Sequence, residues 1–332
     1  MEIKQELLSF PAANGEGNIF VRAWFAGNLR LIKPAAIVQI AHGMSEHSGR
    51  YDEFARYFCL NGFFVVAGDY AGHGLSVQGH PGAFSAKAGG LDFTIEDLHH
   101  IFEIAAEKIG ALGDAKGIPR ILFGHSMGSV FSAIYAERKG GLAALVMSGT
   151  PSGIKFSRLF SLIAGAISKT RGHLARSPLL EYLTGSAANL PPAEAERKRQ
   201  WLSRDPEKVR EFCNDPLCGF DYTAGGYSVM LRGYHYINSK KWGRHIGDIP
   251  VLVVGGTDDT ASECGKGPEK YAGRLRDSGH TKVELKLFPE CRHEIINELN
   301  RQEIYKYLCD WFKGISKNFS RRDAETQREH CN

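Results

Sequence analysis

Short apolar runs alternate with segments of helical periodicity through most of this chain. The runs are rich in Val, Ile, Phe and Ala, which is typical of strands that are buried on both faces of a sheet. We expect strands at residues 19–24, 35–40, 63–67, 121–123, 142–147, 251–254 and 283–288. Because most of the intervening segments can hold a crossover helix, the pattern predicts an α/β fold with a mostly parallel sheet and helices on both faces.

Several segments between these strands repeat their apolar residues at the spacing of an amphipathic helix. In the clearest case, Ile95, Leu98, Ile101 and Phe102 fall on one face of a helix expected at 93–109. Further helices are expected at residues 51–58, 129–137 and 294–312.

The alternation stops between about residue 151 and residue 247, where helical stretches and a loop with two prolines contain no comparable strand. We therefore predict a core of residues 1–150 and 248–316, a helical cap insertion of residues 151–247, and a polar, flexible tail of residues 317–332. An insertion between two strands of a parallel sheet should cover the C-terminal edge of the sheet, where open α/β sheets bind ligands.

Composition narrows the function mainly by exclusion. The chain has 332 residues, 43% of them hydrophobic and 23% charged, and a net charge of +4, which is too small to indicate a nucleic-acid partner. The seven cysteines are scattered and odd in number, which favours free thiols in a reducing cytoplasm. No secretory signal or membrane-spanning run of ~18 apolar residues is present, and no Cys and His set has metal-site spacing. We expect a cytoplasmic protein without a metal or other cofactor.

The strand predicted at 121–123 leads directly into Gly124-His125-Ser126-Met127-Gly128, which is followed by the helix predicted at 129–137. A Gly-x-Ser-x-Gly turn between a strand and a helix is typical of a nucleophile elbow. The turn is so tight that side chains at Gly124 and Gly128 would clash, and it holds the Ser126 hydroxyl above the sheet. The pattern alone could be a chance match in a glycine-rich loop, but its position favours a nucleophilic serine.

A nucleophilic serine needs a general base and a carboxylate that orients the base. His293 lies in the loop after the last predicted strand, and Asp258 and Asp259 follow the strand at 251–254. This chain order of serine, carboxylate and histidine is that of elbow-type hydrolases. The residues alone leave the carboxylate open, because either aspartate could also be a turn or N-cap residue.

The oxyanion of an acyl-transfer intermediate requires two preorganised N–H donors. The backbone N–H of Met127, directly after the nucleophile, is one candidate. The other is the N–H of Met44, because His42-Gly43-Met44 follows the buried run at 35–40. The alternative for this second segment is a turn that only ends the strand.

Together these features resemble the monoacylglycerol lipase and lysophospholipase branch of the α/β-hydrolases, often labelled serine aminopeptidase-like hydrolases. The resemblance spans about residues 19–315, and it rests on the elbow and on four stretches: HGMSEHSGRY at 42–51, DYAGHGLS at 69–76, DPLCGF at 215–220 and GKG at 265–267. It implies an α/β-hydrolase fold with a helical cap.

The resemblance also bears on single residues. The spacing of the family favours Asp259 as the acid and leaves Asp258 as the alternative, although Thr260-Ala261 stand where the family often has Pro-Val. Glu46, His47 and Asp69 are implied to shape the oxyanion loop and the neighbouring turns.

The family resemblance implies a serine hydrolase that cleaves esters of single-chain lipids, either monoacylglycerols or lysophospholipids, through an acyl-enzyme. In the cap, Phe156, Phe160 and Ile163 share one helical face, which could line an acyl-chain tunnel or rest transiently on a membrane surface. The same face could instead pack on the core. The other functions to be tested are a general carboxylesterase for short soluble esters and, from a different class, a non-catalytic binding protein with the same fold.

Overall fold

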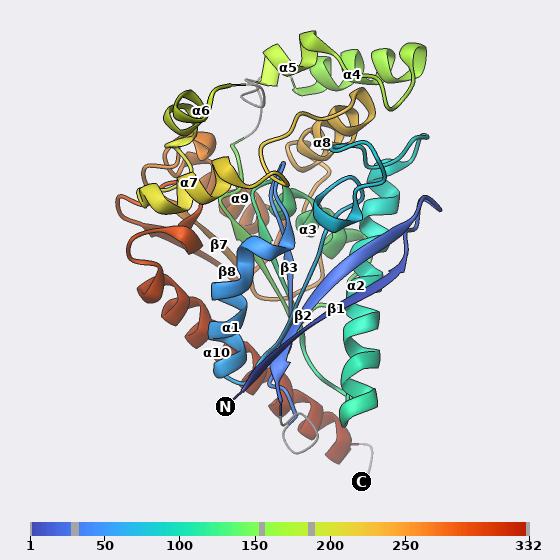
Figure 1. The fold of residues 1–332 in the computed structure, drawn as a ribbon. Coiled ribbons are helices and arrows are strands. Elements are labelled where there is room, and N and C mark those ends of the chain that lie inside the picture. Colours follow the sequence, from blue (N-terminus) through green and yellow to red (C-terminus); the bar gives the residue numbers. More distant parts are fainter. Residues whose placement is uncertain (1, 28–32, 153–156, 185–189, 330–332) are drawn as a thin grey trace.

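An eight-stranded sheet forms the centre of the computed structural model, which describes residues 2–27, 33–152, 157–184 and 190–329 (Figure 1). The strand order is β1-β2-β4-β3-β5-β6-β7-β8. The β1–β2 and β2–β4 pairs are antiparallel and every other pair is parallel. The strands are β1 Ile3–Pro11, β2 Asn18–Ala26, β3 Ile37–Ala41, β4 Phe64–Gly68, β5 Arg120–His125, β6 Ala144–Ser148, β7 Val251–Gly256 and β8 Val283–Phe288.

All seven strands expected from the apolar runs are present, and the prediction of a mostly parallel sheet is confirmed. The strand that the sequence did not reveal is β1, at the edge of the sheet. Its residues are only partly buried or exposed, and it begins with Ile3-Lys4-Gln5-Glu6. Edge strands commonly carry such charged residues, so β1 has no continuous apolar run.

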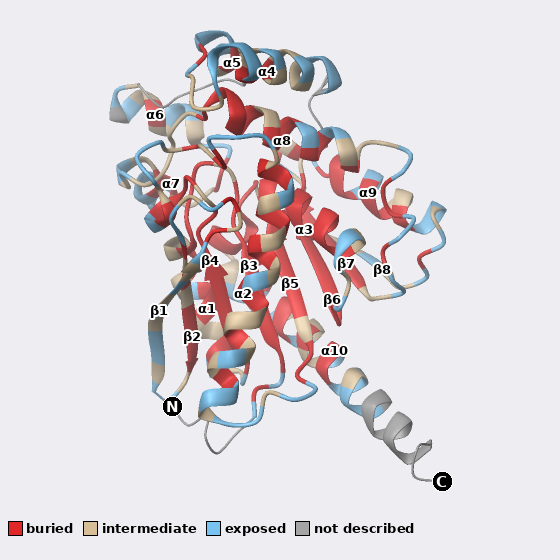
Figure 2. Ribbon diagram, turned by 90° about the vertical axis from the view of Figure 1, so that its right-hand side faces the viewer, coloured by how far each residue is buried: buried red, intermediate tan, exposed pale blue. Residues whose placement is uncertain are grey.

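Helices cover both faces of the sheet (Figure 1). On one face lie α2 (Gly90–Leu112), α3 (Met127–Arg138) and α9 (Lys266–Asp277), and on the other lie α1 (Asp52–Leu60) and α10 (Arg301–Glu329). The side chains of each central strand alternate between the two cores. In β7, for example, Val251 and Val253 belong to the first core, and Leu252 and Val254 belong to the second. Figure 2 shows that the central strands and α3 are almost entirely buried.

Five helices lie between β6 and β7 in the described part of the chain: α4 Ser157–Arg171, α5 Pro178–Thr184, α6 Pro192–Arg199, α7 Pro206–Asn214 and α8 Ala224–Ile237. Figure 1 shows α4, α5, α6 and α7 above the sheet. The α8 helix is buried and packs against α2 and α3. The boundaries of the predicted cap remain a prediction, and α8 contributes to the core as well.

The last helix starts later and ends later than the sequence pattern predicts. It begins at Arg301, and it continues past Phe312 to Glu329, through most of the segment expected to be a flexible tail. Ile315 and Phe319 still pack against the second core. Beyond them, helix propagation needs no new nucleus and the residues are mostly good helix formers. Every helix within the described ranges is too short or too polar to span a bilayer.

Candidate active site

The turn between β5 and α3 forces Ser126 into a strained backbone conformation, with φ 51° and ψ −119°. The two flanking glycines are sterically required. A Cβ atom on Gly124 would lie 2.5 Å from the carbonyl oxygen of Gly128, and a Cβ on Gly128 would overlap the carbonyl oxygen of Ala41. The start of α3 can therefore pass directly against the end of β3, and Ser126 is held at the C-terminal edge of the sheet.

His293 and Asp259 meet in the loops that follow β8 and β7. The ring Nδ1 of His293 lies 3.0 Å from Oδ2 of Asp259. The other oxygen of this carboxylate accepts hydrogen bonds from the backbone N–H groups of Ala261 and Ser262, at 2.9 and 3.4 Å. Both partners of the pair are almost fully buried, so the carboxylate holds the imidazole in one orientation with its Nδ1 protonated.

Burial and charge act in opposite directions on this pair. Burial alone would raise the pKa of Asp259, but the neighbouring imidazole and the hydrogen bonds hold that pKa below its ordinary value. Burial alone would lower the pKa of His293, but the Asp259 carboxylate raises it. His125 lies with its ring centroid 4.9 Å from that of His293, and burial lowers its pKa to about 4, so it stays neutral near pH 7.

Asp258, the alternative acid, is placed differently. Its side chain is exposed, and its Oδ1 accepts a hydrogen bond from the Thr257 hydroxyl at 3.1 Å. The geometry therefore brings His293 together with Asp259 and leaves Asp258 at the surface.

The loop after β3 lies against the nucleophile turn. A Cβ atom on Gly43 would lie 3.3 Å from that of Ser126, so the absence of a side chain allows this close approach. The backbone N–H of Gly43 donates to the Glu46 carboxylate. Met44 is half-buried and lines the same cavity as Ser126, whereas Met127 is fully buried at the start of α3.

Arg50 joins this loop to the histidine loop, a connection that the sequence reasoning did not identify. Its guanidinium makes a bidentate ion pair with Glu294, with N–O distances of 2.8 and 2.7 Å, and a second ion pair with Glu46 at 2.5 Å. Both carboxylates are buried, and the Arg50 side chain is 10% exposed. Burial alone would raise the pKa of Glu46, but the nearby Arg50 guanidinium lowers it to about 2. The pKa of Glu294 is lowered for the same reason. Arg50 lies inside the HGMSEHSGRY stretch, and this position was the one indication in the sequence that Arg50 belongs to the site.

A cavity of about 250 Å³ opens above Ser126 and His293. Its apolar wall comes from α7, the loops on either side of α7 and the start of α8, and its members are Trp201, Leu202, Phe212, Phe220 and Tyr227. Lys198 and Asp221 place charges of both signs on the wall. The ring of Trp201 lies 4.9 Å from that of His293, centroid to centroid.

Among the described residues, the two cap residues predicted to bind substrate, Phe160 and Ile163, are not part of the lining of this cavity. Phe160 and Ile163 pack against the first core, where α4 lies along α8. Phe156 lies outside the described residues. This packing favours the alternative that the shared face of Phe160 and Ile163 rests on the core, and their role in binding substrate stays a prediction.

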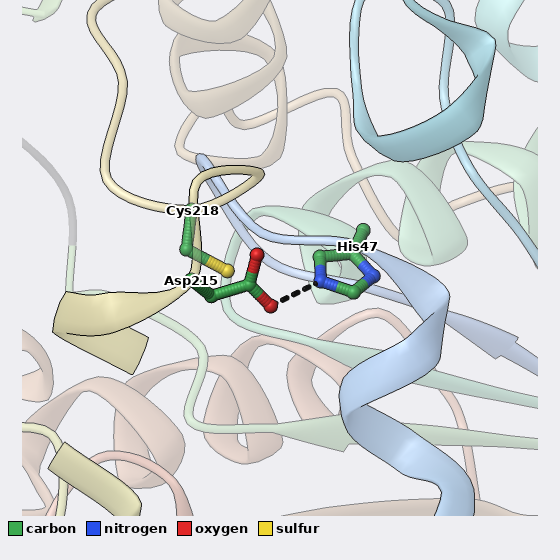
Figure 3. A group of neighbouring side chains, drawn as sticks. All are labelled: His47, Asp215 and Cys218. Carbon is green, nitrogen blue, oxygen red and sulfur yellow. Dashed lines mark hydrogen bonds and ion pairs between the residues drawn. The ribbon is translucent and has the colours of Figure 1, made fainter. Parts of the chain in front are cut away.

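One side-chain group has the composition of a metal site. His47, Asp215 and Cys218 place candidate ligand atoms within 4.8 Å of one another (Figure 3). However, Nδ1 of His47 accepts a hydrogen bond from the N–H of Gly49, so the imidazole proton is on Nε2 and points at the Asp215 carboxylate, 2.8 Å away. The group therefore acts as a hydrogen-bonded link between the loop after β3 and the segment after α7.

The chain is similar to known proteins over most of its length. The family model described as serine aminopeptidase, S33 matches residues 32–300. The chain is 28% identical over 280 residues to a monoacylglycerol lipase of Mycolicibacterium smegmatis, covering 84% of this chain and 88% of the relative. It is 27% identical over 282 residues to the phospholipase YtpA of Bacillus subtilis, covering 82% of this chain and 93% of the relative. The structure of a thermostable carboxyl esterase from Bacillus coagulans in complex with glycerol matches with a TM-score of 0.82 and 27% identity, covering 94% of this chain and 99% of that chain.

Proposed function

Because the chain belongs to the serine aminopeptidase S33 family, adopts the α/β-hydrolase fold and is a carboxylic ester hydrolase, we propose that it cleaves esters of single-chain lipids through an acyl-enzyme intermediate. The observation that carries the proposed mechanism is the buried His293–Asp259 pair beside the strained Ser126, where all three residues lie in loops at one edge of the sheet.

In the proposed reaction, the Ser126 hydroxyl attacks the ester carbonyl carbon while His293 accepts its proton. His293 then passes the proton to the departing alcohol, and Asp259 keeps the imidazole oriented and stabilises its charged form. The N–H groups of Met44 and Met127 bind the oxyanion. Water, activated by His293, then attacks the acyl-enzyme and releases the fatty acid.

The proposed substrate class has two supports. The relatives include a protein named as a monoacylglycerol lipase and one named as a phospholipase. The apolar wall formed by residues such as Trp201, Leu202 and Phe212 suits an acyl chain. Lys198, Arg199 and Asp221 place charges of both signs around this cavity, and the experiment below distinguishes the head groups.

The experiment is release of fatty acid from 1-monooleoylglycerol, lysophosphatidylcholine and a short p-nitrophenyl ester, with Ser126→Ala as the control. Oleate release from either lipid that is lost in the variant supports the proposal and shows the preferred head group. Turnover of the short ester alone would contradict the lipid assignment.

A general carboxylesterase is the second candidate. It is favoured by the similarity to the Bacillus coagulans carboxyl esterase, which extends over nearly the whole chain. Chain-length dependence separates the two candidates, because an acyl-chain site should make kcat/KM rise with the length of the acyl group.

The outer face of the cap supports transient contact with a membrane surface as part of the same proposal. Leu159, Leu162, Leu179 and Tyr182 are between 51% and 84% exposed on α4 and α5. These two helices lie at the top of the molecule, farthest from the sheet (Figure 1). Exposed apolar side chains gathered on one face are typical of a surface that meets lipid or another protein.

A further inference from the structure

Ser45, the residue after the proposed oxyanion donor Met44, has a left-handed backbone conformation with φ 53°. A non-glycine residue persists in such a conformation only where its surroundings hold it there. Its N–H donates to the Tyr222 phenol oxygen at 3.3 Å, and its hydroxyl donates to the Phe220 carbonyl at 2.7 Å. Its carbonyl accepts from the Gly219 N–H at 2.8 Å. The segment that precedes α8 thus holds every polar group of Ser45.

The phenol of Tyr222 has a fixed direction. Tyr222 is fully buried, and its oxygen lies 2.6 Å from Nε2 of His73. The Nδ1 of His73 bonds to the Ala71 carbonyl oxygen, so Nδ1 carries the ring proton and Nε2 accepts the phenol proton. Burial lowers the pKa of His73 to about 3, which keeps this arrangement in place around neutral pH. The lone pairs of the phenol oxygen are therefore available to the Ser45 N–H.

The hydrogen bonds of the three consecutive backbone N–H groups of Gly43, Met44 and Ser45 leave the middle one available. The N–H of Gly43 is used by Glu46 and the N–H of Ser45 is used by Tyr222. Between them, the N–H of Met44 has no acceptor among the residues that the structure describes. An amide whose two neighbours are tied is preorganised to bind a developing negative charge without rearrangement.

We propose that Tyr222 is a positioning residue for the oxyanion hole, acting on the Met44 amide through Ser45. This inference rests on the proposed function, because it concerns the same acyl-transfer site. The phenol oxygen also lies 3.4 Å from Sδ of Met127, so one side chain contacts Met127 itself and Ser45, the residue next to Met44. The hole is thus built jointly by the core and by the segment before α8.

The test is Tyr222→Phe, assayed with p-nitrophenyl butyrate. Since loss of one oxyanion donor typically costs ~10²–10³ in rate, loosening one should lower kcat by about tenfold or more, with KM within about twofold. The affinity of a long-chain trifluoromethyl ketone should fall by a similar factor, because Ser126 adds to its carbonyl carbon and the carbonyl oxygen becomes an oxyanion. The affinity of the ether 1-O-octadecylglycerol, which forms no oxyanion, should not change.

The matched control is Tyr271→Phe. Tyr271 is also fully buried, and its hydroxyl donates to the Pro151 carbonyl oxygen and accepts from the Asn238 amide, away from the oxyanion loop. The Tyr271→Phe variant should lower the melting temperature about as much as Tyr222→Phe does, and it should leave kcat unchanged. A folded Tyr222→Phe protein with kcat within twofold of wild type would overturn the proposal. An equal loss of kcat in Tyr271→Phe would do so too, by showing that lost stability is the cause.

If Tyr222→Phe does not fold, Ser45→Ala removes only the hydroxyl link to Phe220 and tests the same positioning. It should lower kcat and ketone affinity together, and unchanged values of both would contradict the inference. Failure of the proposed lipid function is a separate outcome, which is seen if the wild-type protein releases no oleate from either lipid. Turnover of p-nitrophenyl butyrate would still report on Tyr222 in that case.

Discussion

Ser126 has a backbone conformation that costs of the order of 1–3 kcal/mol for a residue with a side chain. Interactions with the surrounding structure offset this cost. The N–H of Ser126 donates to the Ser148 carbonyl at 2.8 Å, and the flanking glycines allow α3 to start against β3. Strain of this kind, held by a rigid sheet on one side and a buried helix on the other, is typical of a residue positioned for chemistry.

At the residue scale, the two neighbouring aspartates provide a matched pair of variants. We predict that Asp259→Asn lowers kcat by about 10⁴-fold, because the asparagine amide no longer enforces the required tautomer of His293. Asp258→Asn should stay within about twofold of wild type, since its carboxylate is exposed and bonded to Thr257. Steady-state kinetics on a p-nitrophenyl ester measure both, and equal losses would show that the acid is wrongly assigned.

The pH dependence follows from the raised pKa of His293. The general base must be neutral, so kcat/KM should rise with pH through that pKa, with a midpoint above the ordinary value of about 6.5. Asp259→Asn removes the charge that raises the pKa of His293. In this variant the remaining activity should therefore rise with pH at a lower midpoint than in wild type. A profile from about pH 5 to 9 measures the shift. A wild-type midpoint below 6.5 would show that burial outweighs the Asp259 charge.

At the scale of elements, Arg50 connects segments that are far apart in the sequence. It pairs with Glu46 in the loop after β3 and with Glu294 after β8, and its guanidinium lies 4.7 Å from the ring centroid of Phe212 in α7. The carboxylates are buried, so their charge is tolerated only because the guanidinium faces both of them. The loop after β3, the loop after β8 and α7 are therefore held in one arrangement by one side chain.

We predict that Arg50→Met lowers the free energy of unfolding by about 3–5 kcal/mol near pH 7, because two buried carboxylates lose their partner. The pKa values of Glu46 and Glu294 are lowered in the folded state. Their contribution is thus complete above the ordinary value of 4.5 and is lost as pH falls through the folded values, about 2 for Glu46. The difference between variant and wild type should therefore shrink below about pH 4.5.

Denaturant unfolding at several pH values makes this measurement. The control is Arg56→Met, which breaks an exposed pair with Asp52 and should cost less than about 1 kcal/mol. An Arg50→Met cost no larger than that of Arg56→Met would mean that the buried pairs do not contribute to stability.

At the scale of the whole molecule, the helices α4 and α5, which carry exposed apolar side chains, lie at the end of the molecule away from the sheet (Figures 1 and 2). The α4 segment contains Arg158, Lys169 and Arg171 and no Asp or Glu. Basic residues beside apolar ones are typical of surfaces that meet anionic lipids. The proposed membrane contact would bring the active-site cap, and not the opposite end of the molecule, to the lipid.

We predict that replacing Leu159 and Leu162 together by Asp lowers binding to anionic lipid vesicles by at least about tenfold, since a buried Leu side chain is worth about 1.5–3 kcal/mol. Vesicle co-sedimentation measures binding, and hydrolysis of a short p-nitrophenyl ester should not change. Leu60→Asp is the control, because Leu60 is 57% exposed at the end of α1. Equal binding by both variants and wild type would rule out contact through α4.

The parallel sheet and the chain order of the proposed catalytic groups could both be predicted from local sequence. Buried strands must be continuously apolar, and a nucleophile turn requires glycine at both flanking positions, so both leave their mark on consecutive residues. The edge strand β1 was missed because its residues are only partly buried or exposed, and the far end of α10 was missed because its sequence from residue 320 onward is mostly polar and shows no apolar period.

What the cavity is made of was decided only by the tertiary structure. Phe160 and Ile163 have the pattern of an amphipathic helix, and that pattern is the same whether the face meets a substrate or α8. The choice between Asp258 and Asp259 depends on which carboxylate reaches His293, a contact between loops 34 residues apart. The roles of Arg50 and Tyr222 come from partners up to 244 and 177 residues away. Sequence periodicity reports on local burial, whereas these contacts depend on how distant loops converge at one edge of the sheet.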